Sequence, residues 1–239
     1  MSDLSQCEFY HTVELPDGSV TRAEWDLRPG VEKYLGKVDF SGRRVLEIGP
    51  ASGFLSFHME KQGAKVIAVE PPIDTFWDLV PRAGGDLESL KNQFRSHIER
   101  IRNSFWYLHR LNQSDVELYE ASAYALPDEL GTFDTGLLAC VLLHCSCPVR
   151  MIESVSRRVS RTLIICEVYH EELGSDPVCG LLPAGNNDLV DTWWRFSPTF
   201  FVNYLAVLGF TSSRVIRHRQ FVPRSRTWVE MFTVVSNRP

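Results

Sequence analysis

Residues 43–72 read RRVLEIGPASGFLSFHMEKQGAKVIAVEPP, a short strand, a glycine turn, a helix and a second strand. The apolar runs at 45–48 and 66–69 are typical of buried parallel strands. The residues between them, 54–62, have the pattern of a helix, and a glycine follows in the usual C-terminal position. Many nucleotide-binding enzymes share this outline, so the turn must show which nucleotide fits.

The turn itself reads Gly-Pro-Ala-Ser-Gly, residues 49–53. Gly49 permits a sharp bend without a Cβ clash, and Gly53 lets the following helix approach a ligand closely. A dinucleotide-binding turn has the pattern GxGxxG, but Ala51 replaces its second glycine and Phe54 its third. No Gly-Lys-Ser/Thr follows, so the P-loop pattern is absent as well. The turn therefore favours a nucleoside without a pyrophosphate.

Two acidic residues accompany the turn. Glu47 precedes it and would repel phosphate, which favours a cationic or amine-bearing ligand. Glu70 ends the second strand, where a carboxylate accepts hydrogen bonds from both hydroxyls of a ribose. In an open parallel sheet, ligands bind beyond the carboxyl ends of the strands, which is where both acids fall. The stretch thus predicts a site for a cationic nucleoside.

The rest of the chain alternates strands and helices. Apolar periodicity predicts a long amphipathic helix from residue 87 to 108, capped by Asp86, and Ser197 caps a later helix that Pro198 opens. The other predicted elements are helices near 29–36, 149–159 and 198–208, strands at 116–119, 133–144 and 162–169, and a hairpin over 213–237. This order predicts an α/β sheet with helices on both faces.

Composition narrows the class of protein further. The chain has 239 residues, of which 44% are hydrophobic, without an apolar run near the ~20 residues that span a bilayer. The N-terminus lacks the basic and apolar regions of a signal peptide, so we expect a cytoplasmic location. None of the six cysteines forms a CxxC pair, so we expect free thiols and no metal. The net charge of −5 argues mildly against a nucleic acid as the main partner.

Several motifs then fall in one order: VLEIGPASG at 45–53, Glu70, EASAYALP at 120–127, FDTGLLACVLLHCSCP at 133–148 and LGF at 208–210. They resemble the motifs of class I S-adenosylmethionine-dependent methyltransferases, over roughly residues 41–239. The resemblance implies a Rossmann-like, mostly parallel seven-stranded sheet with helices on both faces and a C-terminal antiparallel hairpin. Residues 1–40 would form an N-terminal cap, with insertions in the domain near 73–110 and 170–196.

The resemblance also implies S-adenosylmethionine as the cofactor and a set of residues that bind it. Ser122 occupies the position at which the family usually places an Asp against the adenine amine. The implied cofactor-binding residues are Glu47, Gly49, Ala51, Gly53, Glu70, Ser122, Ala123 and Ala139.

Within that superfamily, the chain is similar to the wobble-uridine tRNA carboxymethyltransferase group. The shared features are Trp25-Asp26 before the first motif, the VLLH segment and the aromatic WWRFSP before the last helix. That group binds a carboxylated methyl donor with the help of a tyrosine before the histidine. Leu143 stands there in this chain, which favours plain S-adenosylmethionine.

The acceptor site has one candidate base and several candidate pocket residues. His144 follows the fourth strand, and a neutral imidazole suits proton removal near pH 7; the alternative is that it packs its loop. The candidate substrate-binding residues are Trp25, Trp106, Tyr107, His109, Tyr169, Trp193 and Trp194. For each of them, packing of a helix or a loop is the alternative role.

Three functions are compatible with these residues. The first is methyl transfer to an oxygen or nitrogen of a small, aromatic or partly apolar acceptor, as in secondary metabolism. The second is modification of RNA, for which five arginines without an intervening acid, between Arg214 and Arg226, offer a basic surface; a solvated hairpin face is their simpler role. The third is a non-catalytic S-adenosylmethionine-binding module. The sequence predicts neither the acceptor nor the oligomeric state.

Overall fold

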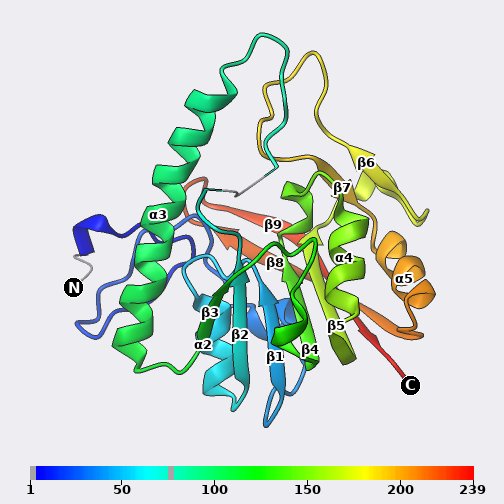
Figure 1. Ribbon diagram of the computed structural model, residues 1–239, viewed down its shortest axis with the longest axis horizontal. Coiled ribbons are helices and arrows are strands. Elements are labelled where there is room, and N and C mark those ends of the chain that lie inside the picture. Colours follow the sequence, from blue (N-terminus) through cyan, green and yellow to red (C-terminus); the bar gives the residue numbers. More distant parts are fainter. Residues whose placement is uncertain (1–3, 75–77) are drawn as a thin grey trace.

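The computed structural model describes residues 4–74 and 78–239. Its main sheet has the strand order β3-β2-β1-β4-β5-β9-β8, and β6 and β7 form a small second sheet (Figure 1). The strands are β1 (Arg44–Ile48), β2 (Lys65–Glu70), β3 (Glu117–Glu120), β4 (Phe133–Ala139), β5 (Val159–Val168), β6 (Cys179–Leu181), β7 (Trp194–Phe196), β8 (Ser212–Val222) and β9 (Thr227–Asn237). The α-helices are α1 (Val31–Tyr34), α2 (Phe54–Lys61), α3 (Leu87–Asn112), α4 (Pro148–Ser156) and α5 (Pro198–Val207).

Strand directions confirm the predicted fold class. β1 to β5 are all parallel to one another, whereas β9 runs antiparallel to both β5 and β8. The chain winds outward from β1 in one direction to β3 and then crosses back to β4. The gap at the carboxyl ends of β1 and β4 is therefore the switch point at which such sheets bind ligands.

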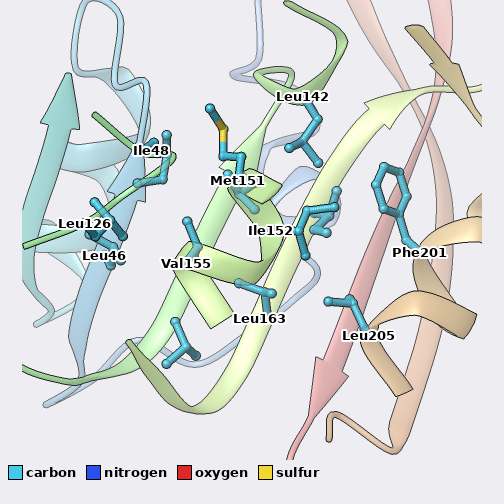
Figure 2. Packing of buried hydrophobic residues seen from close by; sticks show 14 of the residues in the cluster. Leu46, Ile48, Leu126, Leu142, Met151, Ile152, Val155, Leu163, Phe201 and Leu205 are labelled. Carbon is cyan, nitrogen blue, oxygen red and sulfur yellow. The ribbon is translucent and has the colours of Figure 1, made fainter. Parts of the chain in front are cut away.

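Helices cover both faces of the sheet. Because side chains alternate along each strand, successive residues contact helices on opposite faces. Leu46, Leu138 and Ile165 face α4 and α5, and Figure 2 shows Leu46 with the α4 residue Ile152 and the α5 residue Phe201 in this cluster. The neighbouring residues Val45, Leu137 and Ile164 face the opposite way, toward α1, α2 and α3. Burial on both faces explains why these strands are continuously apolar.

Two helix starts are confirmed by their caps. The Asp86 carboxylate accepts the Ser89 backbone N–H at 2.9 Å at the start of α3. The Ser197 hydroxyl accepts the Phe200 N–H at 3.2 Å at the start of α5. Each cap satisfies a backbone donor that the first helical turn leaves without an internal partner.

Two predicted elements extend at least three residues past their observed ends. The strand predicted over 133–144 ends at Ala139, because Cys140 takes a left-handed conformation with φ 51°, and residues 142–144 form a 3-10 turn. The helix predicted over 149–159 ends at Ser156. The residues after Ala139 are as apolar as β4 itself, so hydrophobicity gives no boundary there. Val159, which continues the apolar pattern of α4, is instead the first residue of β5.

Three further segments surround the carboxyl ends of the strands. The N-terminal segment, residues 4–40, docks on the sheet through the Asp26 N–H, which donates to the Phe221 carbonyl of β8 at 2.9 Å. The 78–86 loop and the 182–193 loop rise together above the sheet (Figure 1), joined by the Val80 N–H to the Val190 carbonyl at 2.8 Å. Among the described residues, no helix has the length and apolarity needed to cross a bilayer.

Candidate functional site

A cavity of about 230 Å³ lies at the carboxyl ends of β1, β2, β3 and β4. Its sheet side is lined by the turn after β1, by the end of β2 and by the connections after β3 and β4. The N-terminal segment and α3 line the rest. The lining residues used below are Tyr10, His11, Trp25, Tyr34, Ile48, Gly49, Ala51, Glu70, Asp78, Arg102, Ala121, Ala123, Tyr124, Ala139, Cys140, Val141 and His144.

The glycine turn holds an unusual backbone against this cavity. Gly49, Ala51 and Gly53 have φ of 70°, 50° and 83°, the left-handed region that disfavours a side chain. Gly49 donates its N–H to the Val69 carbonyl at 3.0 Å, and a Cβ on it would lie 2.8 Å from Val141. Gly49 and Ala51 line the cavity, so the turn presents backbone to any ligand bound there.

Glu70 lies beside the turn at the end of β2. Burial raises the pKa of its carboxyl to about 7, although the Arg102 guanidinium and the Ala51 N–H both favour the charged form. Arg102 is held in place by Glu120 at 2.6 Å and by the Pro71 carbonyl at 3.0 Å. A half-buried carboxylate of this kind accepts hydrogen bonds strongly, because little water competes for it.

Glu47, predicted to bind the cofactor, does not line the cavity. Its side chain is 1% exposed and accepts the Ser56 hydroxyl of α2 at 2.5 Å. Burial, with a smaller contribution from the nearby Glu70, raises the pKa of its carboxyl to about 7. Because side chains alternate along β1, Ile48 points to the cavity and Glu47 points beneath the turn, toward α2.

Gly53 and Ser122 also lie outside the cavity lining. The space beside Gly53 is filled by the rings of Phe57 and Phe105, which would lie 2.4 and 2.8 Å from an added Cβ. This glycine thus serves the packing of α2 against α3. Ser122 is turned away, and its hydroxyl accepts the Tyr124 N–H at 3.3 Å, whereas Ala123 lines the cavity.

His144 lies in the 3-10 turn after β4 and lines the cavity. Its Nδ1 is 2.6 Å from the carbonyl oxygen of Asp191 in the 182–193 loop. A carbonyl only accepts, so Nδ1 carries the proton and Nε2 carries the lone pair of the neutral ring. The turn is also fixed by Glu167, which is 2% exposed and accepts the Leu142 N–H at 3.2 Å.

Of the predicted aromatic residues, only some lie at the cavity, and Trp25 is one that lines it. Ala139, predicted to bind the cofactor, lines the cavity at the end of β4. Trp106, Tyr107 and His109 lie on α3 outside the lining: Trp106 packs on Phe105, Tyr107 packs on Phe9, and His109 donates to the Val116 carbonyl at 3.0 Å. Their spacing places them on turns of α3 beyond the cavity, next to the end of the helix.

Tyr169, Trp193 and Trp194 are likewise outside the lining. Arg217 lies over the Tyr169 ring at 3.5 Å, so this ring supports the hairpin. Trp194 donates its indole N–H to the Cys145 carbonyl at 2.7 Å. Trp193 donates its own to the carbonyl of the cavity residue Asp78, so the pair braces the rim of the cavity.

The sequence analysis did not single out several cavity residues, among them Tyr10, His11, Tyr34 and Cys140. His11 is 6% exposed, and burial lowers the pKa of its imidazole to about 3, so the ring is neutral. Its backbone N–H donates to the Ser52 hydroxyl at 3.2 Å, which ties it to the glycine turn. The Tyr34 hydroxyl lies 3.5 Å from the Cys140 sulfur. In the sequence, the one feature that indicated a role for these N-terminal residues at the cavity is the aromatic pair Tyr10-His11 before Trp25.

No cluster of three or more metal-binding side chains exists among the residues that the structure describes. Three loops converge at the cavity: the Tyr124 hydroxyl and the Ser146 N–H, the latter at 2.7 Å, both donate to the Asp78 carboxylate. The cavity is therefore closed by chain segments far apart in sequence.

The strand order, with a cavity at the switch point, is that of a Rossmann-like fold, which this chain shares with solved methyltransferase structures. No model of a known protein family matches the sequence, and no curated protein does. Solved structures do match. The N-terminal domain of EvdMO1 with SAH bound has a TM-score of 0.52 and 18% identity, over 88% of this chain and 79% of that one.

Two further structures have the same fold. Magnesium protoporphyrin IX methyltransferase from Synechocystis PCC 6803, with SAH bound, gives a TM-score of 0.54 at 15% identity, covering 89% of this chain and 82% of its own. The 1,6-didemethyltoxoflavin-N1-methyltransferase from Burkholderia thailandensis gives 0.52 at 16% identity, covering 83% and 72%. At such identities the likeness shows the fold, and function must be argued from the site.

Proposed function

We propose that this protein transfers a methyl group from S-adenosylmethionine to an oxygen or nitrogen of a small, planar or partly apolar acceptor. The observation that carries this proposal is one cavity, lined both by the glycine turn with Glu70 and by His144 with the N-terminal aromatic residues. The three structural neighbours described above support it, since each is a named methyltransferase or was crystallised with SAH.

Residues on the sheet side would bind the donor. The Glu70 carboxylate accepts the ribose hydroxyls, and the backbone at Gly49 and Ala51 packs against the rest of the nucleoside and its amino-acid tail. Ala123 and Ala139 leave room for the adenine and the sulfonium group. The sulfonium is cationic, which suits a cavity lined by the acidic residues Glu70 and Asp78.

Residues on the opposite side would bind the acceptor. Tyr10, Trp25 and Tyr34 offer apolar ring surface, and the neutral His11 offers a polar group next to the turn. This composition favours a planar acceptor with few charges.

Methyl transfer then needs alignment and one proton acceptor. The acceptor's lone pair attacks the methyl carbon while the bond between that carbon and sulfur breaks, which leaves S-adenosylhomocysteine. We assign His144 Nε2 as the base that takes the acceptor's proton, since its Nδ1 is already protonated toward Asp191.

Calorimetry with S-adenosylmethionine tests the proposal directly. We expect saturable binding, followed by methylation of some members of a panel of phenols and aromatic nitrogen heterocycles. Absence of any heat of binding at millimolar donor would refute both enzyme proposals. Binding without transfer to any small or RNA acceptor would instead favour a non-catalytic module.

RNA modification is the second candidate. Its main sequence feature was the basic hairpin, but three of those arginines have partners within the chain. Arg214 donates to the Gly36 carbonyl at 2.7 Å, Arg217 lies over Tyr169, and Arg219 pairs with Glu230. Filter binding of a tRNA mixture at low salt tests this candidate. RNA binding by the wild type that is lost in the double variant Arg224→Ala, Arg226→Ala would support RNA modification.

A further inference from the structure

The 182–193 loop is held on one side by a single arginine. Arg82, in the 78–86 loop, donates from Nε to the Leu189 carbonyl at 3.0 Å and from Nη2 to the same oxygen at 2.9 Å. Its Nη1 donates to the Ala184 carbonyl at 3.2 Å, and its Nη2 also donates to the Asn187 side-chain oxygen at 2.8 Å. One planar guanidinium thus fixes three residues of the loop, a geometry that lysine cannot reproduce.

These contacts lead directly to the cavity. Val190, next to Leu189, accepts the Val80 N–H at 2.8 Å, and the following residue, Asp191, accepts the His144 Nδ1–H at 2.6 Å. Two residues further, the Trp193 N–H donates to the Leu143 carbonyl at 2.7 Å. Every peptide unit from Leu189 to Asp191 therefore has its carbonyl engaged, first by the 78–86 loop and then by the turn that carries His144.

We infer that Arg82 is a positioning residue for His144: by docking the 182–193 loop, it holds the Asp191 carbonyl where it fixes the His144 tautomer and leaves the lone pair on Nε2. The inference rests on the proposed function for its consequence, because only a base needs that lone pair facing the acceptor. The arrangement of the two loops itself is independent of any reaction.

Imidazole nitrogen NMR on protein labelled with nitrogen-15 in histidine tests this without an acceptor. His144→Gln identifies the signal among the seven histidines. In the wild type we expect the Nδ1–H tautomer to dominate by about tenfold, roughly the value of one buried hydrogen bond. Arg82→Ala should lower that ratio several-fold, toward the Nε2–H form that free imidazole favours, and Arg82→Lys should give an intermediate ratio.

Arg157→Ala is the matched control, since this arginine is exposed at the C-cap of α4 and pairs only with Glu153 among the described contacts. It should leave the His144 signal as in the wild type. Near-UV circular dichroism verifies the fold, and Arg82→Lys decides the matter if Arg82→Ala unfolds. A wild-type His144 tautomer in folded Arg82→Ala or Arg82→Lys protein would overturn the inference.

S-adenosylhomocysteine calorimetry separates this inference from the proposed function. We expect each folded variant to bind S-adenosylhomocysteine within twofold of the wild type, because Arg82 does not line the cavity. If neither the wild type nor any variant binds S-adenosylhomocysteine, the proposed function fails. A change of the His144 tautomer in Arg82→Ala would still support the positioning role of Arg82. Once an acceptor is known, Arg82→Ala should lower kcat with KM for the donor unchanged.

Discussion

Replacing Glu47 by Gln should stabilise the protein at alkaline pH and leave it almost unchanged in acid. The carboxyl is 1% exposed, and its pKa is raised from 4.5 to about 7, chiefly by burial. The folded protein therefore retains a proton over a range in which the unfolded chain has already lost it. Because the folded state binds more protons there, the free energy of unfolding falls as pH rises from 4.5 to 7.

The size of the effect follows from that difference in pKa. At ~1.4 kcal/mol for each pH unit, ionised Glu47 lowers the free energy of unfolding by about 3 kcal/mol at pH 8. At pH 5 the same calculation gives less than ~1 kcal/mol. Gln resembles the protonated acid and still accepts the Ser56 hydroxyl, so Glu47→Gln removes the penalty without leaving a donor unpaired.

Urea unfolding at pH 5 and pH 8 measures the effect. The Glu47→Gln protein should gain about 2 to 3 kcal/mol over the wild type between these two pH values. Glu117→Gln, at an exposed position on β3, controls for the loss of one negative charge. An equal difference between mutant and wild type at both pH values would show that Glu47 is solvated, and the reasoning about its burial would be refuted.

Three other changes test separate parts of the structure. Glu70→Ala should weaken S-adenosylmethionine binding by ~1–3 kcal/mol through lost charge-assisted hydrogen bonds; unchanged affinity in calorimetry would place the ribose elsewhere. Gly53→Ala should lower the free energy of unfolding by ~2 kcal/mol or more, since its φ is 83° and its Cβ would overlap the Phe57 and Phe105 rings. Wild-type stability in urea would mean that these rings move aside freely. Ser197→Ala should lower stability by ~1–2 kcal/mol through the lost α5 cap, and Ser197→Asp should restore part of it.

Much of the fold could be predicted because its signals are local. The two N-caps at Asp86 and Ser197 are short-range patterns, and the apolar runs at β1, β2 and β4 need no partner to be recognised. Boundaries within the apolar segment from Phe133 onward were not predictable, since the strand and the turn that follows it are equally apolar.

The candidate site, like the fold, was predictable only where its signals are local. The sequence by itself indicated the turn at Gly49 and the acid at Glu70, because both directly follow or end an apolar strand and ligands bind beyond the carboxyl ends of such strands. It did not determine that Glu47 points beneath the turn, although the alternation of side chains along β1 contained the information. The sequence also could not exclude Trp106, Tyr107 and His109 from the site. Which turns of α3 face the cavity depends on how the whole helix packs against the sheet.

Only the tertiary structure decided which distant segments meet. The N-terminal residues Tyr10 and His11 reach the cavity because their segment docks on the sheet and on the glycine turn, contacts between residues more than 40 positions apart. Arg82 and His144 are linked through a loop about 100 residues away from the arginine. Such contacts are selected by shape and by hydrogen bonds available only after the chain is folded, so no local pattern in the sequence records them.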